Sequence, residues 1–148
     1  MSLQSSPDYD AFSAKLGAVF DICSRVNVYC GMSLLNLRAW IIPAIELNQV
    51  VIFYDQTGIA VAYFSWAYLD RSESKLFVED LGAPLTHHQR LEGDEFWITD
   101  LVATGNSFST VKKFIKEEVG ASVGVINYKN RKAHTVVRIR LKLLNGER

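Results

Sequence analysis

The sequence lacks several features that would assign it to a functional class at once. Its 148 residues include only two cysteines, Cys23 and Cys30, with no CxxC or Cys/His spacing. This excludes a disulfide framework or a zinc site and is typical of a reducing compartment. Neither a Walker motif nor a GxGxxG pattern is present. The N-terminus has no basic start followed by an apolar segment, as a secretory signal would require. We therefore expect a cytoplasmic protein with no metal.

Long apolar runs are also absent, although apolar residues are abundant. The longest uncharged stretch, residues 56–69, contains polar residues and a glycine and is shorter than the roughly 18 residues that cross a bilayer. We therefore expect no membrane span. A composition of 49% hydrophobic and 22% charged residues is typical of a globular chain. The length suits one domain, and we expect a flexible tail over residues 1–7 followed by a single domain over 8–148.

The net charge of zero conceals an uneven distribution of sign. Residues 1–110 carry six Lys+Arg against thirteen Asp+Glu, whereas residues 111–148 carry ten against three. A basic region of this kind favours an acidic partner, although a basic edge strand that resists aggregation would give the same pattern. We expect Lys112, Lys113, Arg138 and Arg140 to contact the partner. The basic side of the last predicted strand has no interleaved aromatic residues, so we expect no nucleic-acid partner.

The predicted elements follow the order αα ββ(β) α β α ββ. Helices are predicted over residues 8–25, from 33 to a stop or kink near Pro43, over 86–91 and over about 107–118. Strands are predicted over residues 49–55 and 59–69 as a hairpin, 75–80 as a short strand after a turn, 95–103, 121–128 and 133–143. Residues 59–69 are apolar on both faces, which indicates a central strand. The order predicts an α+β fold with helices covering a mostly antiparallel sheet.

The strand at residues 95–103 contains an acid among apolar side chains. Phe96, Ile98, Asp100 and Val102 should share one face at a period of two. A buried, ionised and unpaired carboxylate costs several kcal/mol, so Asp100 should have a partner or a shifted pKa. Such carboxylates concentrate at functional sites, but structural ion pairs produce the same perturbation.

Two other segments could contribute chemistry. Gly105 permits a positive φ, and Asn106 or Ser107 can cap the following helix, whose N–H groups attract phosphate. Ordinary capping explains the same residues. Cys30 lies at a break before a helix, where a thiol can become a nucleophile, although a buried packing role is the commoner one.

Three blocks give the sequence a family resemblance. "IIPAIELNQ", "VAYFSWA" and "GDEFWITD", in this order and at this spacing, resemble the toxin-activating lysine-acyltransferases that acylate RTX protoxins, and the similarity covers residues 25–142. The resemblance implies a GNAT-like fold, an acyl carrier protein as donor of a fatty acyl chain, a lysine of a protein toxin as acceptor, and no bound cofactor. It implies that Asp100 is the aspartate of a catalytic His–Asp pair. Ser65 and Trp66, with Gly105, Asn106 and Ser107, are expected to contact the donor substrate.

The histidine of this pair is absent. The corresponding position is Tyr29 without a gap, or Asn27 with a small one, and His87, His88 and His134 lie elsewhere. Tyrosine titrates near 10 and asparagine does not titrate, so three explanations remain open. Asp100 accepts the lysine proton directly or through water, Cys30 carries the acyl group as a thioester, or the chemistry has been lost.

We therefore carry a principal hypothesis and two alternatives. The first is an enzyme that transfers a fatty acyl group from acyl carrier protein to a protein lysine. One alternative is a degenerate homologue that binds acyl carrier protein or another protein without turnover. The other is a GNAT-type N-acyltransferase that uses acyl-CoA on a small amine. A homodimer is compatible with each.

Overall fold

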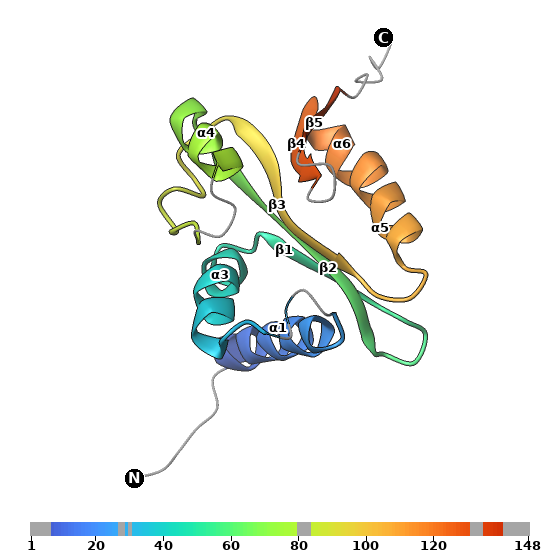
Figure 1. Cartoon of the computed structure of the whole chain (residues 1–148). Helices are drawn as coiled ribbons and strands as arrows, with labels where there is room; N and C mark the ends of the chain where they lie inside the picture. The colour runs from blue at the N-terminus through green and yellow to red at the C-terminus, as the bar shows by residue number, and fades with distance from the viewer. Residues whose placement is uncertain (1–6, 27–28, 30, 80–83, 131–134, 141–148) are drawn as a thin grey trace.

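A five-stranded sheet with helices on both faces organises the chain in the computed structural model (Figure 1). The structure describes residues 7–26, 29, 31–79, 84–130 and 135–140. The strands lie in the order β1-β2-β3-β4-β5, and every neighbouring pair is antiparallel except β3–β4. The predicted α+β fold with a mostly antiparallel sheet is confirmed.

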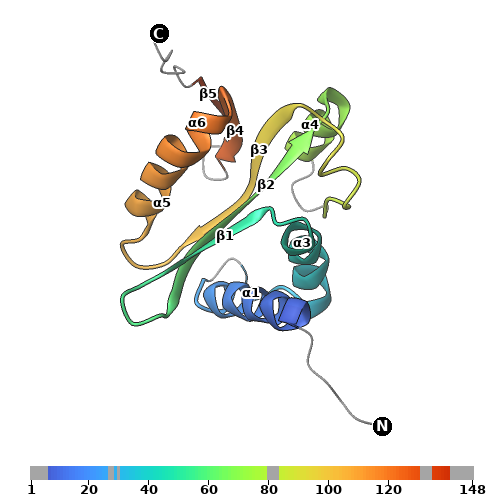
Figure 2. The same ribbon diagram turned by 180° about the vertical axis from the view of Figure 1, so that it is seen from behind.

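The two faces of the sheet are covered by different helices. Helices α1 (Pro7–Ser24) and α3 (Leu34–Glu46) lie on one face, and α5 (Phe108–Phe114) lies on the other, as the front and back views both show (Figures 1 and 2). Strand β2 (Ala60–Leu69) serves both sides: Tyr63 belongs to the core under α1 and α3, and Phe64 belongs to the core under α5. Both side chains have no exposed surface. The predicted central strand is confirmed.

Helix α1 follows its predicted apolar stripe. Val19 and Cys23 are buried, and Phe12, Leu16 and Phe20 pack beside them. The i, i+4, i+7, i+8, i+11 spacing places these side chains on one side of a helix, and that side meets the sheet. Pro7 is the first residue of α1, where its missing N–H costs no hydrogen bond.

Helix α3 does not end at Pro43, although it was predicted to end or kink there. It continues to Glu46, and Ile41, Ala44 and Ile45 are buried on both sides of the proline. Their burial favours one further turn despite the lost N–H donor. The helix ends where Asn48 takes a left-handed conformation, with φ of 54°.

The predicted hairpin is confirmed as β1 (Val50–Tyr54) and β2, joined through a turn at Gly58. The Asp55 carboxylate accepts hydrogen bonds from the Thr57 and Ile59 N–H groups at 2.8 and 3.1 Å. The Thr57 hydroxyl, which donates to the same carboxylate at 2.6 Å, and these backbone bonds hold the pKa of Asp55 below its usual range.

The short strand predicted at residues 75–80 is wrong, because residues 75–79 belong to helix α4 (Arg71–Glu79) and residue 80 lies outside the described residues. Asp70 Oδ1 accepts a hydrogen bond from the Glu73 N–H at 2.7 Å, as an N-cap does. Ser74 and Phe77 form the buried side of the helix. The Asp-x-x-Glu start signal is readable in the sequence.

The helix predicted at residues 86–91 is also wrong. Thr86 and Gln89 exchange hydrogen bonds between side chains and backbone N–H groups at 2.9 and 3.3 Å, as at a helix start. Only turns follow over residues 87–91, because the chain must enter the next strand. Gly93 already donates its N–H to the Tyr68 carbonyl at 3.2 Å.

Strand β3 (Glu95–Ala103) has its predicted bounds, but its predicted face is wrong in part. Asp100 pairs with Ser65 and Ile98 pairs with Trp66, so Thr99 is an extra residue that forms a β-bulge. Ile98, with Phe96, therefore packs under α5, whereas Val102 packs under α1 and α3. The bulge turns Asp100 toward α1 and α3.

The last predicted helix and strands are present. Helix α5 continues through a π-helical turn, η1 (Ile115–Val119), and a short α6 (Gly120–Ser122). Strands β4 (Val125–Asn130) and β5 (Thr135–Arg140) then pair antiparallel, and β4 meets β3 in parallel at Trp97 and Asn127. In the part of the chain that is described, no helix is long and apolar enough to span a bilayer.

Candidate functional site

Among the described residues, side-chain donors from three aromatic residues contact the carboxylate of Asp100, which is 3% exposed. The Tyr29 hydroxyl donates to Oδ1 at 2.6 Å, the Tyr63 hydroxyl donates to Oδ2 at 2.5 Å, and the Trp40 Nε1–H donates to Oδ2 at 3.2 Å. Hydrogen bonds of this kind replace the water that a carboxylate loses on burial. The expectation that Asp100 has partners is confirmed.

Segments far apart in the sequence bring these groups together. Tyr29 lies between α1 and α3, Trp40 lies on α3, and Tyr63 lies on β2. Backbone hydrogen bonds to Val26 and from Met32, each of 3.0 Å, fix Tyr29 in its turn. Tyr29 and Asp100 are 71 positions apart, so their contact depends on the docking of the helical pair onto β3.

Two acidic groups beside Asp100 keep their protons at neutral pH. Burial, together with the Asp100 and Tyr29 charges, raises the pKa of Tyr63 well above 10.0. Burial also raises the pKa of the Cys23 thiol from 9.0 to about 11, although the hydrogen bond to Tyr63 opposes the shift. The Cys23 Sγ lies 3.5 Å from the Tyr63 hydroxyl. Tyr63 is therefore a hydrogen-bond donor to the carboxylate.

A buried arginine, Arg90, lies beside the bulge residue Thr99. Its guanidinium donates to Gln49 Oε1 at 2.9 Å and to the Trp66 carbonyl at 2.7 Å. A longer bond of 3.4 Å reaches Thr99 Oγ1. Burial lowers the pKa of Arg90 to about 10, and the negative charge of Asp100 opposes this shift. Among the described residues, Arg90 makes no salt bridge.

The predicted substrate residues of β2 lie on opposite faces of the sheet. Ser65 is buried on the Asp100 side, with its hydroxyl 2.8 Å from Thr99 Oγ1. The Trp66 ring lies on the α5 side, stacked at 6.4 Å from Phe96. The structure therefore brings Ser65, and not the Trp66 ring, close to Asp100.

The loop before α5 has the predicted glycine conformation. Gly105 has a φ of 59°, which strongly favours glycine, and Asn106 is exposed. Ser107 does not cap α5 through its side chain, because its hydroxyl donates to the Thr104 carbonyl at 2.6 Å. The loop follows β3 directly.

The predicted partner-binding residues do not form one patch. Lys112 and Lys113 are exposed on α5, and the Lys112 ammonium lies 5.6 Å from the centre of the Phe108 ring. Arg138 donates a hydrogen bond to Asn127 Oδ1 of β4 at 2.9 Å. Lys129, which lies on the same side of β4 as Asn127, donates a hydrogen bond to the Val78 carbonyl of α4. Arg138 thus lies on the face opposite α5. The Arg140 side chain is outside the described part of the structure.

Several residues named in the sequence analysis add no described contact to the Asp100 site. Asn27, Cys30 and His134 lie outside the described residues. His87 and His88 are exposed, and their Nε2 atoms lie 3.1 and 2.6 Å from carboxylate oxygens of Glu46 and Glu92. Within the described residues, no three His, Cys, Asp or Glu side chains gather as a metal ion would require.

Sequence reasoning missed Trp40, Tyr63 and Arg90 as neighbours of Asp100. Tyr63 stands in the "VAYFSWA" block and Trp40 is three residues before Pro43, so both belonged to segments already singled out. Both aromatic side chains carry a polar group that needs a partner when buried. Arg90 had no comparable signal, because arginine is normally exposed.

The arrangement is suited to proton transfer. A phenol that donates to a carboxylate keeps oxygen lone pairs that can accept a hydrogen bond from a substrate. As its oxygen gains a proton from that substrate, its own proton can pass to the carboxylate. A phenol hydrogen-bonded to a carboxylate, as Tyr29 is to Asp100, is an arrangement that can relay a proton.

Comparison with known proteins identifies relatives of the chain. The family described as "HlyC: RTX toxin acyltransferase family" matches residues 10–142. A leukotoxin-activating lysine-acyltransferase LktC, serotype T3, of Mannheimia haemolytica is 35% identical over 89 residues, 60% of this chain and 52% of that protein. The protein-lysine myristoyltransferase RtxC of Kingella kingae is 29% identical over 108 residues, 72% of this chain and 63% of that protein. The chain spans about half the length of the leukotoxin-activating relatives.

Proposed function

Since the chain belongs to the RTX toxin acyltransferase family, we propose that it transfers a fatty acyl group from acyl carrier protein to a lysine of a protein acceptor. The hydrogen bond of 2.6 Å between Tyr29 and Asp100 carries the proposal. Counted without a gap, Tyr29 stands where the family resemblance places a histidine (a small gap would give Asn27), and its hydroxyl contacts Asp100. The reaction belongs in the cytoplasm, and the α+β sheet is compatible with a GNAT-like fold.

In the proposed reaction the neutral lysine amine attacks the thioester carbonyl carbon of the donor. A C–N bond forms, and one amine proton passes to Tyr29 Oη while the Tyr29 proton moves to Asp100 Oδ1. The C–S bond then breaks, and the departing thiolate takes up one proton, which the same relay returns. The products are an amide and the free phosphopantetheine thiol. The hydrogen bonds from Tyr63 and Trp40 hold the carboxylate in place.

We propose that acyl carrier protein docks on α5 and that its phosphopantetheine arm passes the end of β3 to reach Asp100, which faces away from α5. Acyl carrier proteins are acidic, and Lys112 and Lys113 are exposed on α5. The preceding loop, with Gly105 in its left-handed conformation, leads back to β3 and Asp100. We place the phosphopantetheine arm along this loop.

The test uses the two tyrosines as matched variants, because each donates one hydrogen bond to Asp100. We expect Tyr29→Phe to lower the rate of acyl transfer by about 10²–10⁴, the usual contribution of acid–base catalysis. Asp100→Asn should lose at least as much. Tyr63→Phe removes a donor outside the relay and should lower the rate less than tenfold. The measurement is the intact mass of an acceptor protein incubated with acyl carrier protein loaded with a fatty acyl group, in single-turnover time courses.

Equal losses in Tyr29→Phe and Tyr63→Phe would contradict the relay. The absent histidine specifically favours a second candidate, a homologue that binds acyl carrier protein without transfer. Binding of the loaded carrier with no acyl group transferred by the parent protein would establish that candidate instead. An acyl-CoA donor is the third arm of the assay, and turnover with acyl-CoA and a small amine would replace the protein-directed proposal.

A further inference from the structure

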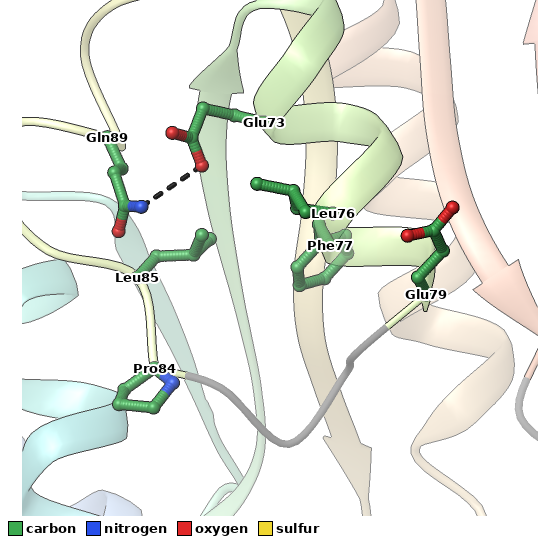
Figure 3. A pocket seen from close by; sticks show the side chains of 7 residues that line it. All are labelled: Glu73, Leu76, Phe77, Glu79, Pro84, Leu85 and Gln89. Carbon is green, nitrogen blue, oxygen red and sulfur yellow. Dashed lines mark hydrogen bonds between the residues drawn. The ribbon is translucent and has the colours of Figure 1, made fainter.

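A pocket outside the Asp100 site lies between α4 and the segment that leads toward β3. Its volume is about 280 Å³ (Figure 3). Leu76 and Phe77 of α4 face Pro84 and Leu85 across it. Phe77 and Leu85 are nearly fully buried, whereas Leu76 is 58% exposed. The pocket therefore has an apolar floor and an open apolar edge, which suits an aliphatic chain.

Carboxylates stand at both sides of the apolar lining. Figure 3 shows Glu73 and Glu79 on either side of Leu76 and Phe77. Glu73 accepts a hydrogen bond of 3.0 Å from Gln89 Nε2, which holds it at the wall. In the described residues neither glutamate forms an ion pair. The pocket thus offers two negative charges without a neutralising cation.

The apolar lining and the two carboxylates together determine which kind of ligand suits the pocket. Lysine carries a flexible apolar stem of four carbons and an ammonium group, so its stem can cover the apolar floor while its charge meets a glutamate. A fatty acyl chain could cover the same apolar floor, but it carries no positive charge to meet Glu73 or Glu79. Charge complementarity therefore favours a basic side chain over the acyl donor.

The pocket is connected to the Asp100 site through Trp40. The Trp40 ring packs against the cluster that contains Phe77 and Leu85, and its Nε1–H donates to Asp100 Oδ2 at 3.2 Å. The pocket and the carboxylate therefore lie on the same face of the sheet. A polypeptide that presents one lysine to Tyr29 and Asp100 can place a neighbouring side chain along α4.

We propose that this pocket binds a second lysine of the acceptor protein, one that flanks the lysine to be acylated, between Glu73 and Glu79. The proposal rests on the proposed function for its biological role. The bound residue fixes the position of the acceptor and is not itself modified. Lysine-bearing segments are thereby selected over neutral or acidic ones.

A direct binding experiment tests the pocket without turnover. The probe is a capped Gly/Ser peptide with two lysines, and its control has norleucine, which keeps the stem and loses the charge, at one of them. We expect the two-lysine peptide to shift the ¹³C-methyl signals of Leu76 and Leu85 saturably. Binding should weaken at least fivefold with the norleucine peptide and in the Glu73→Gln/Glu79→Gln double variant. Asp10→Asn, which removes an exposed charge on α1, should leave binding unchanged.

Kinetics supply the second measurement. In the double variant the KM for an acceptor with flanking lysines should rise at least fivefold, with kcat and the KM for the acyl donor unchanged. Equal methyl shifts with the norleucine peptide, or tighter binding of decanoyl-phosphopantetheine at these methyl groups, would overturn the proposal. So would an unchanged acceptor KM in an active double variant. A peptide-dependent methyl shift in a protein that transfers no acyl group would support the pocket while removing the proposed enzymatic function.

Discussion

An ionised carboxylate is stable inside a protein only when donors replace its lost hydration. Asp100 accepts such bonds from Tyr29, Tyr63 and Trp40. That Asp100 needs partners follows from its place in an apolar strand, so the sequence could predict it. The identity of the partners could not be predicted in full, because they come from a turn, a helix and a strand that meet only in the folded chain. Tyr29 was found through the family resemblance, not from its own chemistry.

The buried Cys23 thiol and Tyr63 phenol give stability a defined dependence on alkaline pH. Their pKa values are raised in the folded state, Cys23 from 9.0 to about 11 and Tyr63 above 10.0. The unfolded chain therefore loses these protons first as pH rises, so we expect full stability below pH 9 and a decline between pH 9 and 11. Cys23→Ala should make the decline shallower and begin nearer pH 10. The measurement is the free energy of unfolding in urea from pH 8 to 11. A variant with the parent's slope would contradict the assignment.

At the scale of the element, local sequence patterns predicted most of the helices and strands. They did not predict the places where tertiary packing overrides the local preference. The stripe of α1 and the double-sided β2 follow from periodicity. Pro43 lies inside α3 because burial of the following turn outweighs its missing donor. Helix α4 was missed because its short apolar run also fits a strand. The bulge at Thr99 could not be predicted, since it depends on pairing with β2.

Two glycines provide a paired test of packing at the junction of β2 and β3. A Cβ on Gly93 would lie 1.7 Å from the Leu69 carbonyl carbon, whereas a Cβ on Gly17 meets nothing within 4 Å. We expect Gly93→Ala to destabilise the fold by roughly 3 kcal/mol or more, because backbone must move. Gly17→Ala, in the middle of α1, should stabilise it by about 0.5–1 kcal/mol. Thermal and urea unfolding measure both changes, and a stable Gly93→Ala protein would show that this close approach is not required.

At the scale of the whole molecule, charge and topology divide the two faces of the sheet. The α1 and α3 face holds Asp100 and continues to the acidic pocket at α4, whereas the exposed lysines of α5 lie on the opposite face. The sequence predicted the charge asymmetry between residues 1–110 and residues 111–148. It could not predict that Arg138 and the α5 lysines are separated, because α5 packs on the face of the sheet opposite the Arg138 side chain.

Donor affinity should depend on salt if the carrier contacts α5. We expect the dissociation constant for acyl carrier protein to rise with ionic strength, because exposed charges are screened beyond about 8 Å at 0.15 M salt. Lys112→Gln/Lys113→Gln should weaken binding about three- to tenfold at low salt and flatten the salt dependence. Lys75→Gln, which removes an exposed charge on α4, is the matched control. Titration calorimetry at several salt concentrations measures each value, and an equal effect of Lys75→Gln would place the carrier elsewhere.

The bulge in β3 makes the fold sensitive to the insertion or deletion of one residue in this strand. At the bulge, the consecutive side chains of Thr99 and Asp100 lie on the same face of the sheet. The alternation of even and odd residues between the two faces is therefore reversed after this point. Loss of a single residue there would restore plain alternation and disturb every contact on one half of the strand, even though no individual side chain is essential to the pairing. Gaps of one residue at this point are therefore expected to be far more harmful in evolution than most substitutions around it.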